Sequence, residues 1–149
     1  HGLPEDHLEI LSTSRKEFAK YPGDRAEYQN GYDRTIEALQ NGTASTAFIG
    51  NNDMTALGIM DAITKLGYKI PFDYSVCGFD NIPLASMKQI SLTTIEHATV
   101  QKGHEAVDLI HKKHSQDHSG RQPSYTVRLE YEPQLIVRNS TGKCRKNLR

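Results

Sequence analysis

Two stretches decide the fold of this chain: Thr46-Ala-Phe-Ile-Gly-Asn-Asn-Asp53 and Tyr74-Ser-Val-Cys-Gly-Phe-Asp-Asn81. In each, a short apolar run predicts a buried strand, and amides and carboxylates follow where the strand ends. Residues 54–66 between them have apolar side chains at helical spacing, and Gly67 provides a helix stop. Two strands joined by a helix pair in parallel with a right-handed crossover. Both polar clusters are therefore expected at one edge of a sheet, where open α/β sheets bind ligands.

Length, charge and cysteine content narrow the class of protein. The 149 residues suffice for one domain with its own core, and 18 basic against 18 acidic side chains leave no net charge to attract nucleic acid. There is no apolar stretch of membrane-spanning length and no signal-peptide pattern. Cys77 lies in a predicted buried strand and Cys144 in the tail, so no disulfide is expected. The composition predicts a reduced, cytoplasmic protein without membrane contact.

Further elements on both sides continue the alternation of strands and helices. Alternating or β-branched runs predict strands, and apolar residues three or four positions apart predict helices. The alternation predicts an α/β fold with a largely parallel sheet and flanking helices. The predicted strands span residues 8–12, 92–96, 125–131 and 135–138, the helices span 24–40 and 99–114, a short helical turn spans 82–87, and a polar loop spans 114–123.

Four segments resemble motifs of the lactose- and galactose-repressor (LacI/GalR) type of transcription regulator. Phe48-Ile-Gly-Asn-Asn-Asp-Met-Thr-Ala-Leu-Gly58 is similar to the AND-x-x-ALG segment, and Ile70-Pro-Phe-Asp-Tyr-Ser-Val-Cys-Gly-Phe-Asp-Asn-Ile-Pro83 to the VPxDxSVxGFDDxP segment. Leu92-Thr-Thr-Ile95 matches LTTI, and Pro133-Gln-Leu-Ile-Val-Arg-Asn-Ser-Thr141 matches PxLIVRxST. The motifs have the family's order and spacing. The last strand is also similar to that of arabinose-responsive regulators, which carry a GntR-type DNA-binding head.

The resemblance implies a two-lobed sensor, similar to periplasmic sugar-binding proteins, in which the chain crosses three times between the lobes. Residues 1–97 and 132–142 would form the second lobe, 98–131 would return toward the first, and 143–149 would be a disordered tail. The DNA-binding head and most of the first lobe are not in this sequence. The implied partners are a small sugar, with L-arabinose as the first guess, a second copy of the chain, and DNA only through the absent head. No cofactor is implied.

Asn52 and Asp80 are the strongest candidates for ligand binding. By the resemblance they occupy positions that hydrogen-bond sugar hydroxyls, and a carboxylate that only accepts, beside an amide that donates and accepts, suits a diol. The same residue types also serve as helix caps or Asx turns without any ligand. We favour ligand binding for Asn52 and Asp80, favour N-capping for Asp53, and hold Asn51 and Asn81 as second-choice contacts.

Several further polar side chains raise alternatives. His97 and Thr99 follow the third predicted strand and can reach the ligand cleft, and a plain surface role is equally supported. His111, His114 and His118 have a helical spacing that can present imidazoles to a metal. No cysteine or glutamate completes such a set, and the polar residues around them indicate a helix end. We therefore predict no metal site.

The apolar face of residues 54–66 has two interpretations. Its simplest role is to form the core of the domain. The resemblance, however, places this helix at the dimer interface of the second lobes. Leu57, Met60 and Met87 are therefore candidates for contact with a second copy, and core and interface are equally supported.

The helix predicted at residues 99–114 carries Val100, Val107 and Ile110, which would pack on the first lobe in a complete sensor. Within this chain they have no evident burial partner, and an exposed apolar stripe of that size usually finds one. We expect the chain to self-associate or to swap residues 98–131 with another copy.

Three classes of function compete. The leading interpretation is the effector-binding and dimerising part of a bacterial transcription regulator, in which ligand binding closes the cleft between lobes and shifts the attached DNA heads. The second is a sugar-binding protein for uptake. The third is a sugar-processing enzyme that uses Asp53 and Asp80 as an acid/base pair. No nucleophile elbow, phosphate-binding glycine loop or metal set accompanies these carboxylates, so no catalytic residue is assigned.

Overall fold

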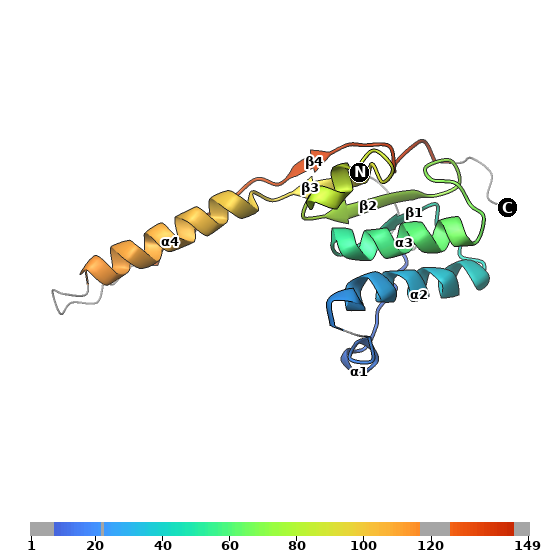
Figure 1. Cartoon of the computed structure of the whole chain (residues 1–149), viewed down its shortest axis with the longest axis horizontal. Coiled ribbons are helices and arrows are strands. Elements are labelled where there is room, and N and C mark those ends of the chain that lie inside the picture. Colours follow the sequence, from blue (N-terminus) through green and yellow to red (C-terminus); the bar gives the residue numbers. More distant parts are fainter. Residues whose placement is uncertain (1–7, 22, 117–125, 145–149) are drawn as a thin grey trace.

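The computed structural model describes residues 8–21, 23–116 and 126–144, and its centre is a four-stranded sheet (Figure 1). The strands follow one another across the sheet in chain order. The first two pairings are parallel and the last is antiparallel, which confirms the predicted α/β class with a largely parallel sheet. The strands are β1 (Ala47–Ile49), β2 (Ser75–Phe79), β3 (Thr93–Glu96) and β4 (Gln134–Ile136).

Two helices stack on one side of this sheet: α3 (Asp53–Lys65) packs on β1 and β2, and α2 (Ala26–Gln40) packs on α3 (Figure 1). Glycine allows the two helices to approach closely, because a Cβ at Gly58 would overlap the backbone carbonyl of Tyr28. The buried core formed between the helices and the sheet comprises Leu39, Phe48, Ala56, Ile59, Ile63, Tyr74, Val76, Ala85 and Leu92.

Helix ends and short elements mostly follow the predictions. α2 is preceded by a 3-10 turn (Gly23–Arg25) and is followed by Gly42 at φ 76°, the expected left-handed stop. The turn predicted at 82–87 is a 3-10 helix (Pro83–Ser86). A short helix, α1 (Arg15–Phe18), interrupts the connection before α2, and a capping box between Ser14 and Glu17 fixes its first turn.

Two strand predictions were wrong. Residues 8–12 form no strand: Leu8 and Ile10 are 71% and 78% exposed, and Glu9 only reaches Thr43 and Ser45 through its side chain. Residues 126–131 are also irregular, and residue 125 lies outside the described residues. An alternating pattern is stable as a strand only with a neighbour that takes up its backbone hydrogen bonds and covers one face.

The last described segment joins the sheet through Ser140. Its backbone carbonyl accepts from Val76 N at 2.8 Å, and its hydroxyl donates to the Val76 carbonyl at 2.6 Å and accepts from Thr93 N at 2.7 Å. Ser140 therefore ties β2 to the start of β3, which holds the C-terminal segment against the body. Of the tail expected at 143–149, residues 145–149 lie outside the described residues.

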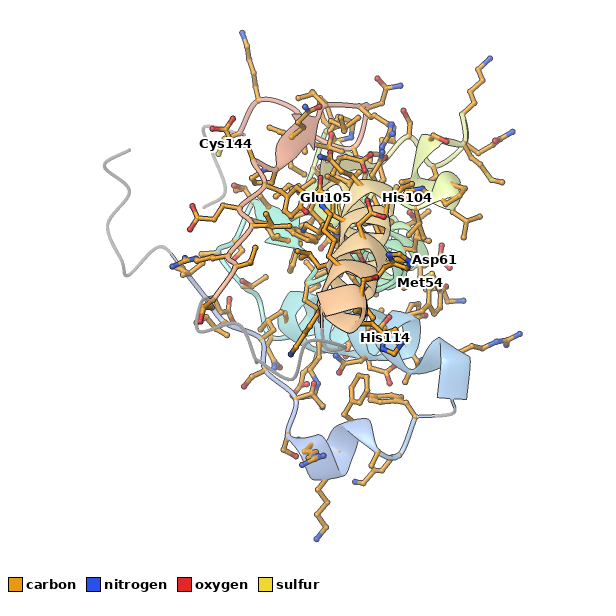
Figure 2. The ribbon with its side chains drawn as sticks, turned by 90° about the vertical axis from the view of Figure 1, so that its left-hand side faces the viewer. Met54, Asp61, His104, Glu105, His114 and Cys144 are labelled. Atoms are coloured by element: carbon orange, nitrogen blue, oxygen red, sulfur yellow. The ribbon has the colours of Figure 1, made fainter. Side chains whose placement is uncertain are left out.

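α4 (Thr99–Gln116) projects away from this body (Figure 1), and it stands in front of the body when viewed along its axis (Figure 2). The helix continues two residues beyond the predicted end, and the remainder of the predicted loop to 123 lies outside the described residues. Val100, Val107 and Ile110 are 75%, 65% and 69% exposed, so none of the other described residues buries this stripe, as predicted. None of the described helices is long and apolar enough to cross a bilayer.

Candidate functional site

The polar clusters after β1 and β2 lie at one edge of the sheet, as predicted from the two quoted stretches. Ile49 pairs in parallel with Cys77, so both strands reach their carboxyl ends on the same side. Asn51 and Asn52 follow the first strand, and Asp80 follows the second at once. This edge is where a ligand of an open α/β sheet would sit.

The first cluster is organised by the start of α3. The N-cap is Asn52, whose Oδ1 accepts from Thr55 N at 2.8 Å, so the prediction that Asp53 caps the helix was wrong. Asn51 Oδ1 accepts from the Thr55 hydroxyl at 2.6 Å. Thr55 thus holds both amides by their oxygens, Asn52 through its backbone N–H and Asn51 through its hydroxyl. These contacts take one lone pair of each amide oxygen, and the NH₂ groups are the donors that Asn51 and Asn52 can offer to a ligand.

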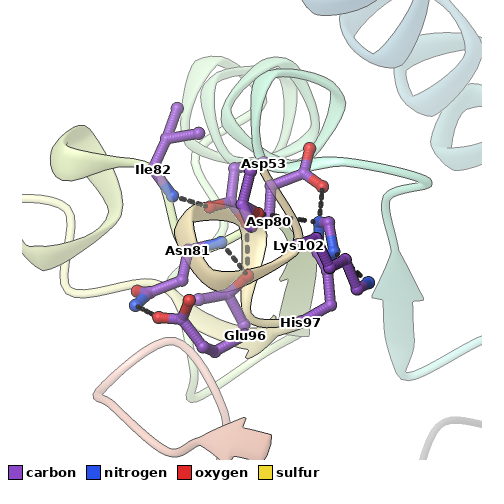
Figure 3. A network of polar contacts seen from close by, with 9 residues as sticks. Asp53, Asp80, Asn81, Ile82, Glu96, His97 and Lys102 are labelled. Atoms are coloured by element: carbon purple, nitrogen blue, oxygen red, sulfur yellow. Dashed lines mark hydrogen bonds and ion pairs between the residues drawn. The ribbon is translucent and has the colours of Figure 1, made fainter. Parts of the chain in front are cut away.

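Asp53 has a different position, as the first residue of α3, where it is fully buried. Its Oδ1 accepts from the Thr94 hydroxyl at 2.5 Å and its Oδ2 from Ile82 N at 2.8 Å (Figure 3). A Cβ at Gly78 would collide with this carboxylate, so glycine is required there for space. Asp53 thus connects the cluster after β1 to β3 and to the turn that follows Asp80.

The second cluster is a strained turn. Asp80 and Asn81 have φ of 107° and 51°, a region that only Asn, Asp and Gly adopt readily. Asp80 N donates to the Ile95 carbonyl at 2.9 Å. The Asn81 amide is used on both sides: its oxygen accepts from Arg138 Nη2 at 2.7 Å and its nitrogen donates to Glu96 Oε2 at 2.6 Å. The turn is thereby held to the end of β3 and to the segment after β4.

The structure brings His97 and Thr99 to Asp80. His97 Nε2 lies 3.0 Å from Asp80 Oδ1 and 3.4 Å from the Thr99 hydroxyl, and His97 Nδ1 lies 2.9 Å from Lys102 Nζ. The imidazole also stacks on Phe79, with 5.0 Å between ring centroids. About 40% of the Asp80 side chain remains exposed, so its carboxylate is accessible to a ligand. The sequence analysis assigned no role in the site to Lys102 or Arg138.

The predicted interface residues are spread between core and surface. Leu57 is half-buried, Met60 packs against the buried core, and Met87 is 50% exposed. Their role in a dimer stays a prediction.

Three of the other histidines, His104, His111 and His114, lie on α4, and His118 lies outside the described residues. Among the described part of the chain, no three His, Cys, Asp or Glu side chains are grouped as a metal site would require.

Comparisons with known proteins agree with this architecture. Residues 5–141 match the periplasmic binding protein-like domain family. The chain is 36% identical to the HTH-type transcriptional repressor PurR of Glaesserella parasuis, over 75% of this chain and 33% of that protein. It is 33% identical to the arabinose metabolism transcriptional repressor of Halalkalibacterium halodurans, over 67% of this chain and 27% of that protein. The chain thus spans about a third of the length of these curated relatives.

A solved structure shows the same fold. The LacI family transcriptional regulator of Enterococcus faecium, with bound ribose, superimposes with a TM-score of 0.63 at 29% identity, over 76% of this chain and 40% of that chain. The order of parallel strands, the four sequence motifs and these similarities lead to one conclusion. The chain belongs to the periplasmic binding protein-like domain family, in the form that LacI-type regulators carry.

Proposed function

We propose that this chain is the effector-binding part of a LacI-type transcription regulator and that it binds a small sugar at the carboxyl edge of the sheet. The observation that carries the proposal is the exposed Asp80 carboxylate, held in a strained turn between His97 and the β3 backbone. Strained, over-determined turns of this kind are typical of ligand sites. The repressor names of the relatives support the regulatory part of the proposal.

The donors and acceptors of the site suit a sugar. Asp80 offers carboxylate lone pairs, and Asn51 and Asn52 offer NH₂ donors, since Thr55 holds both amides by their oxygens. A sugar hydroxyl donates one hydrogen bond and accepts others, so adjacent hydroxyls can satisfy both kinds of group. Thr99, which both donates and accepts, would add a further contact. Asn81 is less available because both sides of its amide already have protein partners.

The two alternative functions are less well supported. An acid/base mechanism would need Asp53 as well as Asp80, but Asp53 is fully buried and its oxygens accept from Thr94 and Ile82. It therefore has no path to a substrate, and the relatives are repressors rather than enzymes. Uptake is not favoured either, because the relatives carry repressor names.

The whole regulator would contain more than this chain. Residues 1–97 and 132–142 would form its second lobe, 98–131 would belong with the first lobe, and a separate head would bind DNA. Two copies would dimerise through Leu57, Met60 and Met87, in the cytoplasm. Sugar bound between the lobes would favour the closed state and so shift the equilibrium of the DNA heads.

L-arabinose is the first effector to test, since one relative is an arabinose metabolism repressor, and D-ribose is the second, because the Enterococcus faecium regulator holds ribose. An amide chemical-shift titration should give a dissociation constant of about 1 mM, or about 4 kcal/mol, because one lobe supplies only part of the contacts. Shifts should centre on Asn52 and Asp80. Asp80→Asn should abolish them, and Asp108→Asn, an equivalent change on the exposed surface of α4, should leave them intact. Equal binding by wild type and Asp80→Asn would refute the site.

The exposed stripe Val100, Val107 and Ile110 supports self-association or exchange of residues 98–131 between copies. Sedimentation velocity should show a dimer or larger species that dissociates in a Val107→Glu/Ile110→Glu variant. A change of Lys112→Glu, which leaves the stripe intact, should have no effect. A wild-type monomer at all concentrations would refute the idea.

A further inference from the structure

The contacts around His97 determine which of its ring nitrogens carries the proton. A lysine ammonium has three donors and no acceptor, so His97 Nδ1, 2.9 Å from Lys102 Nζ, must accept and cannot be protonated. A carboxylate only accepts, so Nε2, 3.0 Å from Asp80 Oδ1, must donate. The neutral imidazole with its proton on Nε2 satisfies both contacts at once (Figure 3). An imidazolium would place an N–H against the ammonium, and the other neutral tautomer would place a lone pair against the carboxylate.

Lys102 is itself held in place by the segment that returns from α4. Its ammonium lies 5.4 Å from the centroid of the Tyr131 ring, within cation–π distance. The Tyr131 hydroxyl donates to Glu105, one turn farther along α4, and this hydrogen bond raises the pKa of Tyr131 and lowers that of Glu105. The Lys102 ammonium therefore lies between His97 and Tyr131, which precedes β4.

We propose that Lys102 is a positioning residue of the ligand site: it fixes His97 as the Nε2–H tautomer and so orients Asp80 for an uncharged, hydroxyl-rich ligand. The part that concerns the ligand rests on the proposed function of Asp80. A neutral His97 donates one hydrogen bond to Asp80 Oδ1 without neutralising the carboxylate by an ion pair. Asp80 therefore keeps its negative charge and its second oxygen for hydroxyl donors. An anionic ligand such as a sugar phosphate would meet that charge and bind less well.

The tautomer is measured directly from the imidazole ¹⁵N and ¹H correlations of His97, assigned by their loss in His97→Gln. Wild type should show the Nε2–H tautomer at neutral pH. Lys102→Met keeps the aliphatic stem but removes the donors, and should give a mixture of the two tautomers at His97. Lys102→Arg keeps a cationic, donor-only group and should restore the wild-type pattern. Lys112→Met, on the exposed surface of the same helix, is the matched control and should not change it.

Ligand binding gives the second readout. Lys102→Met should weaken binding of L-arabinose about threefold to tenfold, the loss expected when one hydrogen bond is no longer oriented, with an unchanged melting temperature. An unchanged His97 pattern in Lys102→Met would overturn the proposal, as would the Nδ1–H tautomer in wild type. If no sugar binds to wild type while Lys102→Met alters the tautomer as expected, the proposed function fails and the positioning of His97 by Lys102 stands.

Discussion

The buried carboxylate of Asp53 makes a strong prediction about stability, tested by the substitution Thr94→Val. Thr94 is fully buried and its hydroxyl donates to Asp53 Oδ1 at 2.5 Å. Valine has the same branched shape, so the change removes the donor and leaves no cavity. A hydrogen bond to a charged group contributes about 1.5–3 kcal/mol, and the carboxylate would keep only Ile82 N as a partner. We expect unfolding to become easier by about 2 kcal/mol.

Urea unfolding followed by far-ultraviolet circular dichroism measures this difference, with an unchanged slope as the sign that the folded state is intact. Thr64→Val is the matched control, because Thr64 is exposed on α3 and its hydroxyl only donates to the Met60 carbonyl. The control should stay within about 0.5 kcal/mol of wild type. If Thr94→Val and Thr64→Val were equally stable, Asp53 would not connect α3 to β3 as argued.

Three further changes test other parts of the structure. The hydrogen bond to Asp61 raises the pKa of Tyr28 to about 12. The stability that this hydrogen bond contributes is therefore complete below about pH 10 and is lost as the pH rises toward about 12. Asp61→Ala should move the titration of the Tyr28 phenol, followed by ultraviolet absorbance, back toward about 10. Gly58→Ala should lower the free energy of unfolding in urea by more than about 2 kcal/mol, because the new methyl group overlaps α2. Gly103→Ala has open space around it and should make α4 more helical by circular dichroism. If both variants were as stable as wild type, the close packing of α3 on α2 would be contradicted. Asn52→Ala should cost about 1 kcal/mol through loss of the α3 cap, and thermal unfolding unchanged from wild type would argue against that cap.

Local sequence patterns were sufficient for most of the fold. β1, α3, β2 and β3 have their signals within short windows: an apolar run, a helical period, and a glycine at a stop. Residues 8–12 failed because their alternating pattern does not reveal whether a neighbouring strand is available. The cap of α3 was misassigned because adjacent Asn52 and Asp53 are both good caps, and the choice depends on Thr94, 41 positions away.

The candidate site was predicted only in part for a similar reason. Asp80 and His97 could be placed at the same edge because each follows a strand. Lys102 reaches His97 because the chain turns at Ala98, which has a φ of 56°. Alanine rarely adopts a positive φ, so the sequence does not predict this turn. Arg138 contacts Asn81 across 57 positions, and an arginine that follows an apolar strand more often faces solvent.

The strained turn at Asp80 and Asn81 persists because the surrounding structure holds it from three sides. Two non-glycine residues at positive φ cost about 1–3 kcal/mol each. Three hydrogen bonds to charged side chains oppose this cost. Asp53 accepts from the backbone N–H of Ile82, which follows the turn. Arg138 donates to the Asn81 amide oxygen, and Glu96 accepts from the Asn81 amide nitrogen. Hydrogen bonds to charged groups contribute about 1.5–3 kcal/mol each, enough to offset the strain. Since these partners come from α3, β3 and the segment after β4, any movement of one of these elements acts directly on the turn that presents Asp80.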